Sequence, residues 1–322
     1  MPVYTNSSFK PPFYFKNNHL QTIFPALLRK VNGVNYERQR LELNDGDFLD
    51  LDWSRNGSKK LIIALHGLEG NAGRPYIKAP IRLFNKNGWD GLAINFRGCS
   101  GVPNRKLYAY HTGETNDLRF ILKKILKENI YDEIALIGFS LGGNVVLKYL
   151  GEESNSLSEK IKKAVTFSVP CDLASASVEL AKWQNTVYMK KFMDALKAKV
   201  KRKEHMVTDD FNLNQIYRSK TFIDFDNAFT APAFGFRDAE DYWTQSSSKP
   251  FLNKIQIPYL IINASDDSFL SKECYPFEEA KRNPLCHLEV PNRGGHVGFV
   301  SPDEHGFYWS ENRALNFILD KH

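Results

Sequence analysis

Ser140 lies at the centre of Gly138-Phe139-Ser140-Leu141-Gly142, a spacing in which a serine can act as a nucleophile. The five residues alone are as compatible with an ordinary turn, but residues 134–137 before them are apolar and predict a strand, and residues 143–150 after them can form a helix. A sharp turn between strand and helix would expose the hydroxyl at the sheet edge, with glycines leaving room on both sides. The pattern therefore predicts a nucleophile elbow.

A serine hydroxyl needs a nearby base, and the base needs an acid that orients it. For an elbow of this kind the expected chain order is serine, acid, histidine. Among the eight histidines, His296 fits best, because it follows the predicted strand at residues 286–290 and lies in the glycine-rich run Arg293-Gly294-Gly295-His296-Val297-Gly298. His287 lies inside that strand and His66 precedes a turn, so we expect structural roles for both.

Two carboxylates are candidates for the orienting acid. The predicted strand at residues 259–262 runs into Asn263-Ala264-Ser265-Asp266-Asp267, and either aspartate is able to reach a histidine at the sheet edge. We favour Asp267, since an aliphatic contact follows it at Leu270, and we expect Asp266 to form or cap the turn.

Donors are also needed for the oxyanion that develops on a substrate carbonyl. The backbone N–H of Leu141, at the start of the helix after the nucleophile, is the first candidate. The second should come from the loop after the predicted strand at residues 61–65, where His66-Gly67-Leu68-Glu69-Gly70 forms a flexible turn. Leu68 is the expected donor there.

The elements that must position these residues alternate between strands and helices. Residues 36–43 and 48–53 flank Asn44-Asp45-Gly46-Asp47 and predict an antiparallel pair. Later aliphatic runs fit strands buried on both faces, and apolar residues at helical spacing from Leu118 to Leu126 fit a helix between two of them. These runs are residues 61–65, 92–96, 134–137, 164–167 and 259–262. The sequence predicts an α/β fold with a mostly parallel central sheet flanked by helices.

The alternation of strands and helices stops between residues 172 and 248. We interpret these residues as a cap insertion in a core of residues 1–171 and 249–322. An apolar stripe at helical spacing begins with Leu180, Trp183 and Val187. Its direction shifts along the sequence, so it can involve more than one helix. The basic run at residues 197–203 is interpreted as a solvated helix end rather than a contact with an anionic surface. The many aromatic residues from Phe211 to Trp243 are able to line an acyl pocket, and ordinary packing explains them equally well.

Composition narrows the class of protein. The 322 residues are 42% apolar, and the 43 basic and 37 acidic residues are intermixed, so the net charge of +6 does not imply nucleic-acid binding. The four cysteines are scattered without metal-ligand spacing and are expected to be reduced thiols. No nucleotide-binding or metal-binding motif is present, so we expect no cofactor and no metal. No apolar stretch reaches the length that a bilayer demands, so we expect a cytoplasmic protein without stable membrane insertion.

Six segments together resemble the α/β-hydrolase superfamily and, more narrowly, its YheT-like esterase family, over nearly the whole chain. These segments are Asn18-His19-Leu20-Gln21-Thr22-Ile23, His66-Gly67-Leu68-Glu69-Gly70, Asn95-Phe96-Arg97-Gly98, Tyr110-His111-Thr112-Gly113-Glu114, Gly138-Phe139-Ser140-Leu141-Gly142-Gly143-Asn144 and Gly294-Gly295-His296-Val297-Gly298-Phe299. The resemblance implies an α/β-hydrolase fold with a helical cap and hydrolysis of carboxylic esters by Ser140, Asp267 and His296. Relatives commonly have proline after the acid, where this chain has Ser268.

The leading hypothesis is a serine esterase that acts through an acyl-enzyme on small-molecule esters, either short- to medium-chain acyl esters or lipid esters. One alternative is acyl transfer, in which an alcohol replaces water. Another is a binding protein without catalysis on a retained hydrolase fold. Oligomeric state is left open by the sequence.

Overall fold

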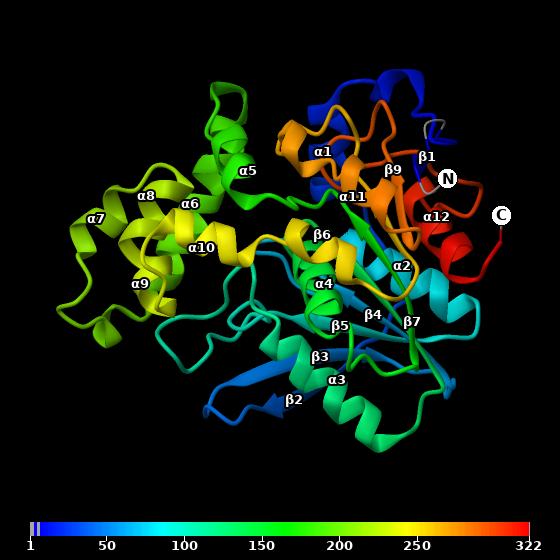
Figure 1. The fold of residues 1–322 in the computed structure, drawn as a ribbon, viewed down its shortest axis with the longest axis horizontal. Coiled ribbons are helices and arrows are strands. Elements are labelled where there is room, and N and C mark those ends of the chain that lie inside the picture. The colour runs from blue at the N-terminus through cyan, green and yellow to red at the C-terminus, as the bar shows by residue number, and fades with distance from the viewer. Residues whose placement is uncertain (1–2, 5–6, 322) are drawn as a thin grey trace.

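Short aliphatic segments form the centre of a nine-stranded sheet in the computed structural model, which describes residues 3–4 and 7–321 (Figure 1). Strands β4 to β8 are almost fully buried, as expected for parallel strands covered on both faces. The strands are β1 (Val3–Tyr4), β2 (Glu37–Glu42), β3 (Phe48–Ser54), β4 (Lys60–Leu65), β5 (Asp90–Asn95), β6 (Glu133–Phe139), β7 (Ile161–Phe167), β8 (Tyr259–Ile262) and β9 (Cys286–Glu289).

The strand order is β1-β9-β8-β7-β6-β4-β5-β3-β2, and every pair is parallel except β2 with β3 and β3 with β5. The predicted α/β class and mostly parallel sheet are confirmed. β7 begins three residues before the expected start, because Lys162 and Lys163 continue the strand beyond its aliphatic part. β1 pairs with β9 and was not expected from the sequence.

Helices cover both faces of the sheet. Helices α2 and α12 pack on one face, with α1 against α2, and α3, α4 and α11 contribute to the apolar core on the other. Their bounds are α1 (Asn18–Leu27), α2 (Pro75–Lys86), α3 (Asn116–Glu128), α4 (Leu141–Glu152), α11 (Phe277–Arg282) and α12 (Trp309–Ile318). The carboxyl ends of the central parallel strands are left for the loops that carry the candidate residues.

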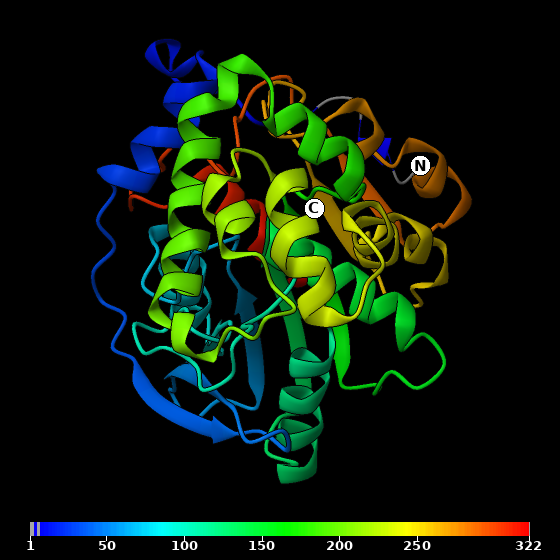
Figure 2. The same cartoon turned by 90° about the vertical axis from the view of Figure 1, so that its left-hand side faces the viewer.

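The chain between β7 and β8 is entirely helical and turn structure. It holds α5 (Leu173–Leu180), α6 (Thr186–Arg202), α7 (Leu213–Arg218), α8 (Phe222–Phe225), α9 (Ala231–Phe234) and α10 (Ala239–Ser246). Most of these helices lie to the left of the sheet in Figure 1 and face the viewer in Figure 2. The cap boundaries at residues 172 and 248 stay a prediction.

The structure adds detail to one expectation for this segment and corrects another. The apolar stripe runs through more than one helix, from α5 through a turn of 3-10 helix at Trp183–Asn185 into α6, and Trp183 and Val187 are exposed. The basic run is solvated only in part, since the Lys203 ammonium is buried against the carbonyl oxygen of Lys106, and Lys199 is paired with Glu69. Helical spacing does not show which lysines of such a run face the protein.

No helix within residues 3–4 and 7–321 is both long enough and apolar enough to cross a membrane.

Candidate active site

Ser140 occupies the tight turn between β6 and α4 with φ 52° and ψ −119°. Residues other than glycine rarely adopt this backbone conformation. Its N–H donates to the carbonyl oxygen of Phe167 at 2.8 Å. A Cβ atom on Gly138 or on Gly142 would lie 2.5 Å from neighbouring backbone atoms, so the turn requires glycine at both places. The sequence thus forces the Ser140 side chain to the edge of the sheet.

Ser140, His296 and Asp267 form a chain of hydrogen bonds. The Ser140 Oγ and His296 Nε2 atoms are 3.0 Å apart, and His296 Nδ1 is 2.8 Å from Asp267 Oδ2. The other carboxylate oxygen of Asp267 accepts the N–H of Phe269 at 2.9 Å, and the Phe269 ring stacks on the imidazole. Because Nδ1–H is directed to the carboxylate, Nε2 is free to accept the serine proton.

Asp266, the alternative acid, does not contact the histidine ring. Its Oδ1 accepts the N–H of Gly295 at 2.9 Å, and its carbonyl oxygen accepts the Asn18 side-chain amide at 2.8 Å. Burial raises the pKa of the Asp266 carboxyl. Of the two carboxylates, therefore, only Asp267 is brought to His296.

Helix α1 holds the loop that carries His296. The N–H of His296 donates to Thr22 Oγ1 at 2.9 Å, and the Thr22 hydroxyl donates to the carbonyl oxygen of Asn18 at 2.8 Å. The side-chain oxygen of Gln21 accepts the N–H of Val300 at 2.6 Å. Sequence reasoning from the residues missed this support, since the partners are more than 270 positions apart. The only signal was the presence of residues 18–23 among the segments that carry the resemblance.

The N–H groups of Leu68 and Leu141 have no acceptor among the described residues, while the N–H groups beside Leu68 are both occupied. Gly67 donates to the Tyr76 hydroxyl at 3.2 Å, and Glu69 donates to the Tyr110 hydroxyl at 3.0 Å. Unpaired N–H groups next to a nucleophile are able to stabilise a developing oxyanion.

His66 supports this turn from inside the protein. Its Nε2 accepts the N–H of Phe96 at 3.1 Å, so Nδ1–H donates to the carbonyl oxygen of Gly67 at 2.7 Å. Complete burial lowers the pKa of His66 to about 3 and keeps the ring neutral. Both ring nitrogens are thus engaged by the backbone rather than by Ser140, as expected for a structural role.

Glu69 joins the same turn to helix α6. It has a positive φ of 53°, and its carboxylate accepts the Tyr110 hydroxyl at 2.7 Å and the Lys199 ammonium at 2.8 Å. Strained conformations of this kind persist only where neighbouring groups hold them. Lys199 thus fastens the segment between β7 and β8 to the turn that carries Leu68.

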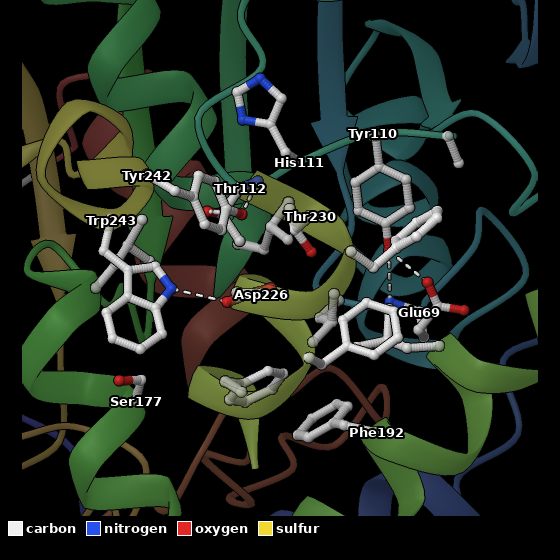
Figure 3. A pocket seen from close by; sticks show the side chains of 18 of the residues that line it. Glu69, Tyr110, His111, Thr112, Ser177, Phe192, Asp226, Thr230, Tyr242 and Trp243 are labelled. Atoms are coloured by element: carbon white, nitrogen blue, oxygen red, sulfur yellow. Dashed lines mark hydrogen bonds between the residues drawn. The ribbon is translucent and has the colours of Figure 1, made fainter. Parts of the chain in front are cut away.

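Two cavities meet at Ser140. The inner cavity, about 140 Å³, lies under α5–α10 and is lined mainly by aromatic and aliphatic side chains (Figure 3). The outer cavity, about 440 Å³, lies beside α1 and the start of α6. Leu68, Phe192 and Phe269 line both, so the two spaces approach the serine from different sides.

The inner cavity contains one buried carboxyl group. Asp226 accepts the indole N–H of Trp243 at 2.8 Å, as Figure 3 shows, and burial raises the pKa of Asp226 to about 6. It lies in a stretch of π-helix between α8 and α9, at residues 226–230. The lining of this cavity thus combines apolar side chains with the Asp226 carboxyl group, and Lys199 and Lys203 also line it.

In the part of the chain that the structure describes, no cluster of three or more histidine, cysteine or acidic side chains is placed to hold a metal ion. Its four cysteines are all buried and unpaired.

Known proteins resemble this chain in sequence and in fold. Residues 60–302 match the family model described as the α/β hydrolase fold. YheT of Escherichia coli (strain K12) is 38% identical over 98% of this chain and 94% of its own length. The phospholipase ABHD3 of Mus musculus is 29% identical over 93% of this chain and 74% of its own. Among solved structures, the Pyrococcus furiosus esterase Pf2001 aligns with a TM-score of 0.60 at 22% identity, covering 91% of this chain and 96% of the esterase.

Proposed function

The chain belongs to the α/β-hydrolase family and is YheT-like within it, and on that premise we propose that it is a serine hydrolase that cleaves carboxylic esters through an acyl-enzyme on Ser140. Relatives named as a phospholipase and as a monoacylglycerol lipase support ester hydrolysis as the reaction. The observation that carries the proposal is the unbroken hydrogen-bonded chain from Ser140 through His296 to the buried Asp267.

In the first half of the proposed reaction, His296 Nε2 takes the proton of Ser140 as Oγ attacks the ester carbonyl carbon. The carbonyl oxygen becomes an oxyanion and accepts hydrogen bonds from the N–H groups of Leu68 and Leu141. Asp267 stabilises the imidazolium and holds its tautomer. His296 then returns the proton to the leaving alcohol oxygen, which leaves the acyl group esterified to Ser140.

In the second half, water enters, His296 removes one of its protons, and the hydroxide oxygen attacks the acyl carbon. The second tetrahedral intermediate collapses, the carboxylic acid leaves, and Ser140 regains its proton from His296. No other group has to change its protonation state.

We further propose that residues 172–248 act as a cap and that the inner cavity holds the acyl chain of a short- to medium-chain or lipid ester. Its lining supports this, since Phe192, Phe225 and Phe229 face a space that begins at Ser140. The leaving alcohol would then occupy the outer cavity.

Hydrolysis of p-nitrophenyl esters of increasing chain length tests the proposal. We expect Ser140→Ala to lower kcat by roughly three powers of ten or more, as removal of a triad serine does elsewhere. The matched control is Ser156→Ala, which removes an exposed hydroxyl bonded to Glu153 and should leave kcat unchanged. Equal activity of Ser140→Ala and the native protein would refute the mechanism.

A further inference from the structure

Exposed apolar side chains are concentrated on one side of the molecule. Of the 15 large apolar side chains that are exposed in the described part of the chain, nine lie in two short segments, residues 13–28 and 178–187. The exposed fractions reach 79% for Phe13, 68% for Leu27 and 86% for Trp183. We call these two segments the apolar collar. Single exposed apolar residues are normal on protein surfaces, but contiguous groups mark interaction sites.

Helix α1 presents its apolar face to the solvent. Leu20, Ile23 and Leu27 follow helical spacing on one side and are all exposed, whereas the buried residues of the helix are Gln21 and Pro25. A helix on the surface of a globular protein normally has the reverse arrangement. The inward face of α1 is occupied by the polar contacts that hold the His296 loop, which leaves the apolar face outside.

The two segments of the collar meet at the mouth of the outer cavity. His19 Nδ1 lies 3.0 Å from the hydroxyl of Tyr188, and their rings stack, so α1 and the start of α6 are neighbours (Figure 2). Ile23, Leu27 and Val187 of the collar themselves line this cavity, which extends to Ser140. The collar therefore lies beside an opening that leads to the candidate nucleophile.

The chain around the first collar segment is positively charged, whereas Glu179 and Lys182 of the second segment are paired with each other. Residues 1–36 contain four basic side chains and no aspartate or glutamate. Arg29 is paired with Glu311, but Lys10, Lys16 and Lys30 are exposed. Helices that lie on the surface of anionic bilayers carry exposed apolar and aromatic side chains together with lysines.

We propose that the apolar collar binds the surface of an anionic lipid bilayer and turns the mouth of the outer cavity toward the lipid. The exposed Trp183 suits this role, since an indole ring is favoured at the boundary between headgroups and acyl chains. Binding itself needs no catalysis. Delivery of a lipid ester from the bilayer to Ser140 rests on the proposed function.

Sedimentation of the full chain with vesicles tests the binding. The native protein should sediment with mixed phosphatidylcholine and phosphatidylglycerol vesicles, and less with phosphatidylcholine alone. A triple variant Phe13→Ser, Leu28→Ser, Trp183→Ser should lower the partition coefficient by about tenfold or more, given the apolar area removed. The matched control Val102→Ser, Ile130→Ser, Ile223→Ser changes three exposed apolar side chains outside the collar and should bind like the native protein.

Tryptophan emission gives a second readout at the collar itself. Trp53, Trp89 and Trp243 are buried and Trp309 is partly buried, so a blue shift on adding mixed vesicles reports mainly on Trp183. Trp183→Phe should lose the shift and still sediment with the vesicles.

Equal vesicle binding by the native protein and the collar variant would overturn the proposal. The proposal would also be overturned if the native protein did not bind vesicles but self-associated through the collar. Self-association would be detected as a lower mass of the triple variant than of the native protein in solution. Hydrolysis of p-nitrophenyl butyrate without vesicles should be the same in all of these variants. A native protein that binds vesicles but cleaves no soluble ester would contradict the proposed function alone.

Discussion

Asp266 and Asp267 are adjacent carboxylates with different partners, and this difference predicts different effects of substitution. Asp267→Asn keeps the size of the side chain but disturbs the tautomer of His296, so kcat should fall by about four powers of ten, as with other triads. Asp266→Asn retains an oxygen for the N–H of Gly295, so kcat should fall less than about tenfold. Ester hydrolysis by the two purified variants measures this. Comparable losses would contradict the assignment of Asp267.

Asp226 predicts a pH dependence of stability. Because burial raises its pKa to about 6 in the folded state, the protonated carboxyl stabilises the fold at low pH. That contribution is complete below the unfolded pKa near 4 and is lost as pH rises through about 6, by up to about 3 kcal/mol. Asp226→Asn cannot ionise and keeps an acceptor for Trp243, so it should gain stability relative to the native protein as pH rises.

Urea unfolding of both proteins at about pH 4 and about pH 7 measures the effect, as a difference of unfolding free energies. A difference that stays constant between the two pH values would show that the carboxyl group titrates normally in the folded state.

Helix α1 supports the site without lining the reacting atoms, and Thr22 is the residue that tests this. Thr22→Val keeps the shape of the side chain but removes the acceptor for the N–H of His296. We expect kcat to fall about three- to tenfold, the effect of one lost hydrogen bond, with KM for a short soluble ester unchanged. Thr208→Val, in the segment between α6 and α7, is the control and should change neither constant. Unchanged kcat in Thr22→Val would mean that α1 does not position the histidine.

Helix α6, in the segment between β7 and β8, is joined to the turn that carries Leu68. Lys199→Met removes the ammonium group held by Glu69, so the strained turn loses one of its supports. The expected result is a fall in kcat of about tenfold, because the Leu68 N–H is then less well placed for the oxyanion. Lys201→Met changes an exposed lysine of the same helix and should be neutral. A pure rise in KM for Lys199→Met would instead indicate a role in substrate binding.

At the scale of the whole molecule, local sequence patterns predicted the sheet and the residues that lie at its edge. Residues 134–137 fall within β6, and Ser140 follows in the expected turn, since strand burial and glycine requirements act over a few neighbouring residues. His296 and Asp267 were found by chain order, and the structure brings both to Ser140. Their catalytic roles stay a prediction.

The features that the sequence did not predict depend on contacts between distant parts of the chain. Thr22 and Lys199 support the site from positions far from Ser140 in sequence, and no local pattern distinguishes them from surface residues. The stripe through Trp183 and Val187 had helical spacing but no indication of which side would be covered. Spacing predicts a face, whereas packing decides whether that face is buried.

The central claim concerns one activated serine, and covalent labelling tests it directly. A fluorophosphonate reacts with a serine whose hydroxyl is deprotonated by a neighbouring base. Peptide mass spectrometry of the labelled full-length protein should place a single adduct on Ser140, and His296→Gln should slow its formation by orders of magnitude. An adduct on another serine, or a native protein that stays unlabelled, would contradict the account.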